Sequence, residues 1–182
     1  MAASPKILWL VRHGETTRSA AGEIAGWSNP PLTEKGRAQA LALAPRLRGE
    51  DFKAVYSSDL KRCISTAKLA RGEAKIDARL RELNFGVYEK KAFHEVDPEI
   101  FAQVAEFRSF EIPGGESLKN FEARLHEAIA EMPTGKLLLF VHGGVIRALC
   151  RRAGLDRFVG TGSLVGLDYD KEKLLFIEGD AT

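Results

Sequence analysis

Two continuous runs of apolar residues mark the centre of a predicted sheet. Residues 7–11 read Ile-Leu-Trp-Leu-Val and residues 136–141 contain Leu-Leu-Leu-Phe-Val, which is typical of strands that are buried on both faces. Both runs lead into a histidine followed by glycine, at His13 and at His142. Shorter strands are predicted at three further positions: 54–56, 164–169 and 173–177, the last two joined as a hairpin by residues 170–172.

Apolar residues recur at helical spacing in four segments between and after these strands. A hydroxyl or carboxylate group precedes three of them and can cap the first free N–H groups of a helix. The predicted caps are Thr33, then Ser58 or Asp59, and Ser117, and a fourth helix is predicted at 145–152 before Gly154. Pro45 is expected to kink or shorten the first helix. The alternation predicts an α/β fold, a three-layer α-β-α sandwich with a mostly parallel sheet and an antiparallel edge.

The segment 88–110 departs from this alternation. It has helical spacing without an obvious strand, it is interrupted by Pro98, and it is dense in phenylalanine: Phe93, Phe101, Phe107 and Phe110. Two interpretations are open. The segment forms either extra helices that cover an edge of the core or a lid over a ligand, since open α/β sheets bind ligands beyond the carboxyl ends of their strands.

Composition narrows the class of protein. With 182 residues, of which 45% are hydrophobic, the chain is predicted to be a single globular domain, residues 1–182. Lysine and arginine number 27 against 25 acidic residues, and a net charge of +2 argues against a nucleic-acid partner held by bulk charge. No apolar run reaches the roughly twenty residues of a membrane span and the start is too short for a signal peptide, so we expect a cytoplasmic protein without a membrane partner. Cys63 and Cys150 are expected as buried thiols, not as a disulfide.

Charged and titratable residues gather at the two strand ends. The motifs of P-loop, dinucleotide-binding, serine-hydrolase and zincin sites do not occur in the sequence. His13 and His142 are expected to meet at the carboxyl edge of one sheet, and Arg12 in this apolar setting requires an anionic partner. Arg62, early in the second predicted helix, can point along the same crevice. Two guanidinium groups suit a phosphoryl group.

Six motifs follow one another along nearly the whole chain. They span residues 10–16, 31–36, 57–62, 81–86, 113–117 and 141–144. Together they resemble the histidine phosphatase superfamily, and most of all its α-ribazole-phosphate and broad-specificity phosphatase branch. The resemblance implies a phosphoglycerate mutase-like fold and a phosphatase-type activity on a small phosphorylated substrate.

The resemblance also implies a role for each site residue. His13, in the Arg-His-Gly motif, corresponds to the nucleophile of the family. Arg12, Arg62 and His142 correspond to the residues that hold the phosphoryl oxygens. Glu82 corresponds to the proton donor.

Elementary chemistry is consistent with these roles. An imidazole must be neutral to attack phosphorus, and the positive charges of Arg12 and Arg62 disfavour the imidazolium form of His13. The same arginines, with backbone N–H groups near Gly143, can neutralise the oxygens of the transferring group, so no metal or other cofactor is expected. The negative charge of a bound phosphate favours the protonated carboxyl of Glu82, which can then donate a proton to the departing alkoxide.

Two other interpretations of the same residues stay open. Apart from the resemblance, Glu82 reads as a surface carboxylate that pairs with Arg79 or Arg81. His13, His142 and Glu82 could also form a metal site with two histidines and one carboxylate. The arginines beside them would repel a cation, which disfavours the metal site.

Departures from the family's pattern bear on the predicted reaction. Ser19 stands where many relatives carry a phosphate-binding asparagine, so this phosphate contact is expected to be shortened or lost, and Ala25 stands where a hydroxyl-bearing residue often occurs. The chain is also shorter than typical cofactor-dependent mutases, and a shorter cover over the site favours hydrolysis. We therefore predict a phosphomonoesterase with a phosphohistidine intermediate, acting on α-ribazole 5'-phosphate or on a broad range of esters. A phosphoglycerate mutase and a non-catalytic phosphate-binding scaffold are the alternatives.

Overall fold

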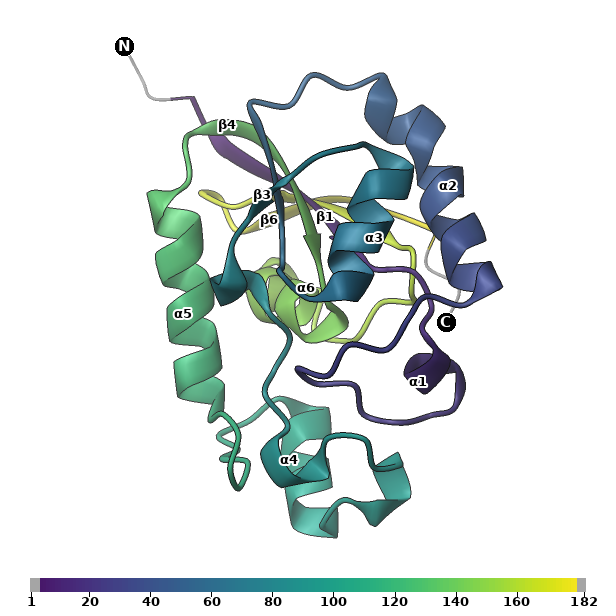
Figure 1. Cartoon of the computed structure of the whole chain (residues 1–182). Helices are drawn as coiled ribbons and strands as arrows, with labels where there is room; N and C mark the ends of the chain where they lie inside the picture. Colours follow the sequence, from purple (N-terminus) through teal and green to yellow (C-terminus); the bar gives the residue numbers. More distant parts are fainter. Residues whose placement is uncertain (1–3, 180–182) are drawn as a thin grey trace.

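A six-stranded sheet runs through the centre of the molecule, with helices on both of its faces (Figure 1). The computed structural model describes residues 4–179. The strands are β1 (Lys6–Arg12), β2 (Ala54–Ser57), β3 (Lys75–Ile76), β4 (Gly135–Val141), β5 (Leu164–Asp168) and β6 (Lys173–Glu178). The main helices on the sheet are α2 (Glu34–Arg48), α3 (Lys61–Ala70), α5 (Leu118–Glu131) and α6 (Gly143–Cys150). Short helices elsewhere are α1 (Thr17–Ala20), η1 (Ala78–Leu80) and η4 (Arg151–Ala153).

The strand order is β3-β2-β4-β1-β5-β6. Strands β1 to β4 run parallel, β5 runs antiparallel to β1, and β6 runs antiparallel to β5. The predicted sheet, mostly parallel with an antiparallel edge, is confirmed. The pattern of apolar residues does not predict β3, because both of its residues are exposed.

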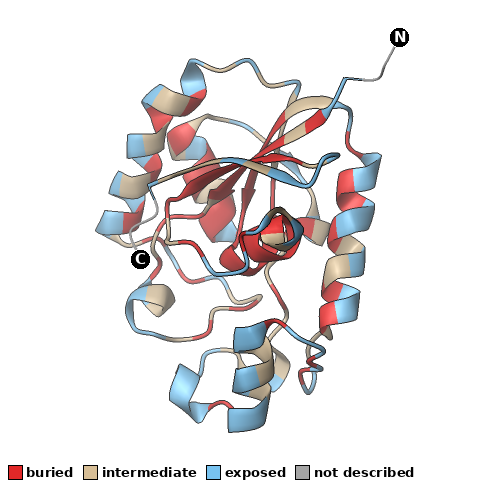
Figure 2. Ribbon diagram, turned by 180° about the vertical axis from the view of Figure 1, so that it is seen from behind, coloured by how far each residue is buried: buried red, intermediate tan, exposed pale blue. Residues whose placement is uncertain are grey.

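Side chains of the central strand alternate between two cores. Leu8 and Leu10 of β1 pack with residues of α5 and α6, whereas Trp9 and Val11 pack with residues of α2 and α3. Figure 2 shows the central strands buried and the helices buried on their inward sides. Burial of successive side chains on opposite faces explains the unbroken apolar run, and the arrangement confirms the predicted α-β-α sandwich.

The predicted helix caps are present at α2 and α5, but the predicted effect of a proline is not observed. Thr33 caps α2 and Ser117 caps α5, each through its side-chain oxygen, as predicted. Pro45 lies inside α2, which continues to Arg48, so the expectation that Pro45 shortens this helix is wrong. A proline at this position leaves the carbonyl of Leu41 without its helical N–H donor, and Leu41 lies on the exposed side of α2.

The helix α3 begins without the predicted side-chain cap. Its N-cap position is Leu60, and no side chain caps it there. Asp59 pairs with Arg81 at 2.5 Å, while the hydroxyl of Ser58 accepts from the N–H of Leu60 at 3.3 Å and lies 2.9 Å from a ring nitrogen of His142. Both candidate caps are therefore engaged in longer-range contacts.

Residues 86–110, called the cover below, lie beyond the carboxyl ends of the parallel strands (Figure 1). The cover contains η2 (Gly86–Tyr88), η3 (Phe93–Glu95) and α4 (Pro98–Glu106). Pro98 is the first residue of α4, so it begins a helix here instead of interrupting one. Phe107 and Phe110 are buried in the core, whereas Phe93 and Phe101 are exposed. The interpretation as helices that cover the core fits Phe107 and Phe110, whereas the interpretation as a lid over a ligand stays a prediction.

Two further expectations concern the chain as a whole. Cys63 and Cys150 are free and buried, as predicted, and burial raises the pKa of the Cys150 thiol to about 12. No helix within residues 4–179 is both long enough and apolar enough to cross a lipid bilayer.

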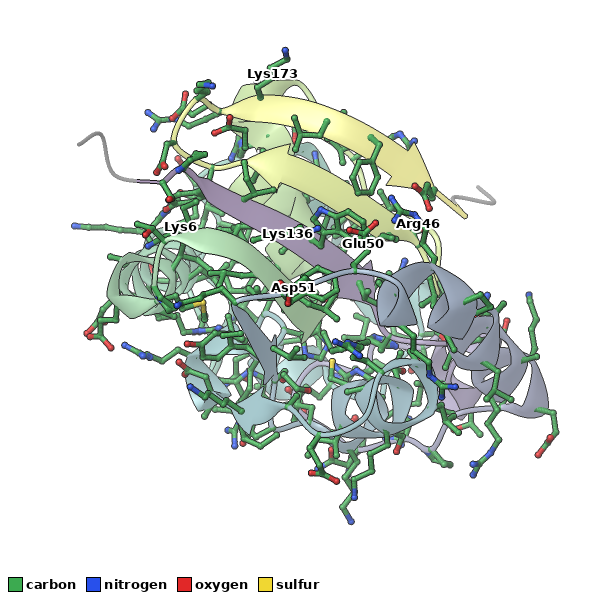
Figure 3. All side chains as sticks on the ribbon, turned by 90° about the horizontal axis from the view of Figure 1, so that it is seen from above. Lys6, Arg46, Glu50, Asp51, Lys136 and Lys173 are labelled. Atoms are coloured by element: carbon green, nitrogen blue, oxygen red, sulfur yellow. The ribbon has the colours of Figure 1, made fainter. Side chains whose placement is uncertain are left out.

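An ion pair lies at the end of the sheet where β4 begins. Lys136 of β4 pairs there with Glu50 at 2.5 Å, and Figure 3 shows both side chains from above.

Candidate active site

Two histidines meet where the central strands end. β1 and β4 pair in parallel with Arg12 opposite Val141, so the next residues, His13 and His142, emerge side by side. Their ring centroids are 5.3 Å apart and their planes are inclined by 64°. His13 is 5% exposed and His142 is 0% exposed. The predicted meeting of two imidazoles at one edge of the sheet is confirmed.

The hydrogen bonds of His13 define its tautomer. Nδ1 lies 2.8 Å from the carbonyl oxygen of Gly14, which can only accept, so Nδ1 carries the ring proton. Nε2 therefore has a free lone pair and accepts a hydrogen bond from Nε of Arg62 at 3.1 Å. Burial, and then the positive charges of Arg62 and Arg12, hold the pKa of His13 well below its usual value. The ring is therefore neutral near pH 7.

Arg62 is held by backbone carbonyl groups of one loop. It is 1% exposed, Nη1 donates to the carbonyl of Ser28 at 2.8 Å, and Nη2 donates to the carbonyl of Gly26 at 2.7 Å. With the bond to His13, these contacts use three of its five N–H groups. Residues 26–28 are a part of the site that the sequence does not reveal, because a carbonyl acceptor needs no particular side chain. The sequence indicates only that a buried arginine side chain needs hydrogen-bond acceptors, without indicating which groups provide them.

The same loop is fixed on its other side by Trp27. The indole N–H donates to the carbonyl of Glu82 at 2.8 Å, and the backbone N–H donates to the carboxylate of Glu89 at 2.7 Å. Gly26 has φ +48°, and an added Cβ there would lie 2.3 Å from Oε1 of Glu89. The loop therefore needs glycine at this position.

His142 is enclosed by two side chains. Its Nε2 lies 2.9 Å from Oγ of Ser58 and 3.4 Å from Sγ of Cys63. The thiol also donates to the carbonyl of Val141 at 3.3 Å, and burial raises its pKa. Burial, followed by the charge of Arg62, holds the pKa of His142 well below its usual value. Ser58 and Cys63 lie 84 and 79 positions from His142 in the chain, so these contacts depend on the sheet register and not on a local motif.

Glu82 binds the start of a helix. Its Oε1 accepts the N–H of Leu83 at 2.9 Å and its Oε2 accepts the N–H of Gly144 at 3.1 Å, in the first turn of α6. An added Cβ at Gly144 would lie 2.3 Å from Oε1, so glycine leaves the space for this carboxylate. Arg79 and Arg81 pair with other carboxylates, at Asp77 and Asp59 respectively. The alternative interpretation of Glu82 as a partner of these arginines is therefore wrong.

Three further predicted residues lie close to this centre. Nη1 of Arg12 donates to the carbonyl of Val159, and an added Cβ at Gly143 would lie 3.3 Å from the guanidinium carbon of Arg12. Ser19 belongs to α1, where its hydroxyl accepts the N–H of Thr16 at 2.8 Å in a capping box. Its hydroxyl thus already holds the turn that follows β1.

Most of these residues line one cavity of about 570 Å³. The strand ends, the helices α1 and α3 and nearby loops contribute the polar part of its wall: Arg12, His13, Thr16, Ser19, Glu23, Arg62, Glu82 and Gly143. The cover contributes an apolar part: Tyr88, Phe93, Val96, Ile100, Phe101, Val104 and Ala105. His142 does not line the cavity and contacts it through the ring of His13. The arrangement offers an anion two guanidinium groups, an unprotonated imidazole nitrogen and a carboxyl group.

The two guanidinium groups beside His13 suit an anion and not a cation. Within residues 4–179, no three His, Cys, Asp or Glu side chains come together in a way that could hold a metal ion. Glu82 is bound to backbone N–H groups and does not stand with the histidines as a third ligand.

Comparisons with known proteins extend over nearly all of the described chain. The model of the histidine phosphatase superfamily (branch 1) matches residues 8–175. The chain is 39% identical over 154 residues to "Probable phosphoglycerate mutase GpmB" of Yersinia pestis (strain Pestoides F), covering 78% of this chain and 72% of that protein.

Solved structures agree with this similarity. The crystal structure of phosphoglycerate mutase from Thermus thermophilus matches with a TM-score of 0.87 at 37% identity, over 97% of this chain and 99% of that chain. A protein of Escherichia coli K-12 (substr. MG1655), provisionally named an alpha-ribazole-5'-P phosphatase, matches with a TM-score of 0.80 at 26% identity, over 98% and 97%.

Proposed function

The chain belongs to the histidine phosphatase superfamily (branch 1), and from this premise we propose that it hydrolyses phosphate monoesters of small metabolites through a phosphohistidine at His13. The observation that carries the proposal is the unprotonated Nε2 of His13, which lies beside Arg62 and Arg12 in the wall of one cavity. This combination provides a nucleophile and two charges for the oxygens of a phosphoryl group.

The first step forms the phosphoenzyme. A phosphoryl group that enters the cavity takes over the Nε–H of Arg62, which frees the lone pair of His13 for attack on phosphorus. Arg12, Arg62 and the backbone N–H of Gly143 neutralise the oxygens, while the bond between phosphorus and the ester oxygen breaks. Glu82 protonates the departing alkoxide, and two backbone N–H groups orient its carboxyl group.

The second step hydrolyses the phosphohistidine. The carboxylate of Glu82 accepts a proton from water as the water oxygen attacks phosphorus, and the bond between phosphorus and Nε2 breaks. Inorganic phosphate leaves, and His13 and Glu82 return to their starting protonation states. His142 stays neutral and packs against His13. Because His142 does not line the cavity, the contacts of His142 and Ser19 with the phosphoryl oxygens that the family resemblance implies stay predictions.

Mutase activity is the second candidate, because relatives of this chain are named phosphoglycerate mutases. A mutase must protect its phosphoenzyme from water until the phosphoryl group is transferred. Here Phe93 and Phe101, which cover the cavity, are 51% and 44% exposed. This open cover favours hydrolysis. A non-catalytic scaffold is the weaker proposal, since every residue needed for catalysis is present.

We further propose that the chain is one domain in which residues 88–110 select the substrate. The cytoplasmic location and the independence from nucleic acid, membrane and cofactor stay predictions.

Rapid quenching with a ³²P-labelled ester tests the mechanism. We expect label on the protein that survives base and is lost in acid, as for phosphohistidine, and that appears in inorganic phosphate during turnover. His13→Ala should carry no label, and His126→Ala, a histidine that contacts Tyr169 and does not line the cavity, should label normally. Acid-stable label, or label on His13→Ala, would contradict the assignment. Label that passes mainly to a second phosphoglycerate position would favour the mutase.

A further inference from the structure

We infer that the cavity selects phosphate esters whose leaving group is uncharged and apolar, with the bulk of an aromatic alcohol, and that it discriminates against phosphorylated carboxylic acids. The inference rests on the proposed phosphatase function and names the substrate class of the same site. Three features of the cavity wall carry it: the placement of cations, the carboxylate of Glu23, and the exposed aromatic rings of the cover.

The cations of the cavity wall belong to the phosphate end. Among the described residues that line the cavity, the positively charged ones are Arg12 and Arg62, and both adjoin His13. Both are therefore occupied once a phosphoryl group is bound. The cover contributes only apolar and tyrosine side chains to this wall, and its nearby Lys91, with Nζ 5.5 Å from the centre of the Tyr88 ring, does not line the cavity. The wall of the cover itself therefore holds no counterion for a carboxylate on the leaving group. An unpaired carboxylate against such a wall loses its hydration without compensation.

Glu23 adds repulsion to this lack of a counterion. It lines the cavity together with Ile24 and Ala25, and its carboxylate pairs with Arg18 at 2.6 Å. Arg18 lines a neighbouring hollow of about 580 Å³, not the cavity itself, and Glu23 separates the two. A substrate carboxylate that extends toward this side comes close to a like charge, which the ion pair with Arg18 weakens.

Exposed aromatic rings indicate what the remaining space accepts. Phe93, Phe101 and Phe158 line the cavity and yet are 51%, 44% and 40% exposed. Phe93 and Phe101 pack edge to face with ring centroids 6.2 Å apart, so they form one continuous aromatic surface. Figure 2 shows that most of the cover is exposed. An apolar leaving group would remove this surface from water.

The size of the cavity points the same way. Its volume of about 570 Å³ lies within the roughly 300–1,000 Å³ range of sites for drug-sized molecules, and a phosphoryl group fills a small part of it. A ring system on the leaving group would fill the remainder and contact the cover.

Matched alkyl esters test the selection without altering the chemistry. Propyl, 3-phenylpropyl and 3-(4-carboxyphenyl)propyl phosphate have equally poor alkoxide leaving groups and differ only in apolar bulk and charge. We expect kcat/KM for the phenylpropyl ester to exceed that of each of the other two by about tenfold or more, because one group in an apolar pocket is worth roughly 10- to 200-fold. A carboxylated ester that is hydrolysed as well as the phenylpropyl ester would overturn the inference.

Variants of the cavity wall test which residues cause the selection among these esters. Phe93→Ala combined with Phe101→Ala should bring the ratio of kcat/KM for the phenylpropyl ester to that for the propyl ester close to one. Glu23→Gln should raise the ratio of kcat/KM for the carboxylated ester to that for the phenylpropyl ester several-fold. Leu175→Ala on β6 removes a similarly exposed apolar side chain, at 44%, away from the cavity and should change nothing. Equal losses on all three esters in the double variant would overturn the assignment to the cover.

Binding separates this inference from the proposed reaction. The corresponding propyl, phenylpropyl and carboxyphenylpropyl phosphonates cannot be hydrolysed, and calorimetry gives their affinities whether or not the protein turns over. A tenfold preference for the phenylpropyl phosphonate in a protein that forms no phosphohistidine would support the selection and contradict the reaction. Equal affinities for the three phosphonates would overturn the inference. If the protein then also binds phosphatidylcholine vesicles or self-associates, and the Phe93→Ala and Phe101→Ala changes remove this behaviour, the exposed rings belong to a macromolecular surface.

Discussion

The proposed phosphate pocket, formed by Arg12, His13, Arg62 and the adjoining His142, and the cover lie on different sides of the same cavity. The pocket has buried polar side chains, whereas the cover has half-exposed aromatic rings. The pocket residues His13, Arg62 and His142 are at most 5% exposed, and each has hydrogen-bonding contacts that restrict its side chain. Phe93 and Phe101 of the cover are about half exposed and contact each other. Positions that hold charge must be accurate, because a misplaced buried charge is costly, whereas apolar contact has no preferred direction. We therefore expect the proposed chemistry to depend on the sheet edge and the proposed selection to depend on a segment that tolerates change.

One short segment connects the two regions. Ile24 donates to the carbonyl of Lys91 at 2.9 Å and accepts from the N–H of Lys90 at 2.8 Å, so residues 23–24 are joined to the cover. Two residues later, the carbonyl of Gly26 accepts from Arg62. A substitution that moves the cover can therefore reach the phosphate pocket through this segment, so variants are needed that alter one region and leave the other in place.

The largest expected effect is on the pocket side, at Glu82. Glu82→Gln keeps the shape of the side chain but has no proton to give, so we expect a loss of about 10²–10⁴-fold in kcat on propyl phosphate. On p-nitrophenyl phosphate the loss should be clearly smaller, because nitrophenolate leaves without a proton. Glu34→Gln, which alters a 98% exposed side chain, is the control. Equal losses on both esters would mean that Glu82 only positions the phosphate or the start of α6.

Arg62→Ala should have the next largest effect. It removes a donor to the transferring oxygens and leaves the carbonyls of Gly26 and Ser28 without their guanidinium partner, so kcat/KM should fall by about 10²-fold or more on every ester alike. The matched control is Arg48→Ala at the exposed end of α2. Activity within a few-fold of the wild type would place Arg62 outside the phosphate pocket.

The sequence predicts the pocket better than the cover for a physical reason. A strand buried on both faces requires an unbroken apolar run, so the ends of β1 and β4, and with them His13 and His142, can be located from the residues alone. The proton donor and the phosphate-binding roles came from the resemblance to a family. The structure adds the carbonyl groups of Gly26 and Ser28, which no pattern of residue types predicts.

The two prolines do not interrupt helices as the sequence predicts. Pro45 lies inside α2, one turn after the exposed Leu41, and Pro98 begins a helix because its missing N–H would have no helical partner there in any case. In the cover, helical spacing cannot tell which phenylalanine meets the core. Phe107 packs against Phe121 of α5 and is buried, whereas Phe93 contacts Phe101 of the same segment and is half exposed.

The pH dependence of stability should come from the pocket. His13 and His142 have pKa values well below the unfolded value of about 6.5, so below that pH the unfolded chain binds protons that the folded chain does not. The free energy of unfolding is therefore full above about pH 7 and should decrease as the pH falls from 6.5 toward 5, by at most about 1.4 kcal/mol per pH unit for each histidine. Urea unfolding at several pH values measures this slope. His142→Gln should reduce it, and His94→Gln on the exposed η3 serves as the control.

The smallest expected effect belongs to the cover. Phe93 is 51% exposed, so Phe93→Ala should lower the free energy of unfolding by less than about 1 kcal/mol, within the range of surface substitutions. Phe107 is 1% exposed, and Phe107→Ala in the same segment should cost about 3–5 kcal/mol. Phe93→Ala should also reduce the preference for phenylpropyl over propyl phosphate several-fold while the affinity for vanadate, which only the phosphate pocket binds, stays the same. Thermal or urea unfolding and the two ester rates measure these quantities. If Phe93→Ala destabilises the protein as much as Phe107→Ala, or slows both esters equally and weakens vanadate binding, then the cover is part of the core and the two regions are not separable.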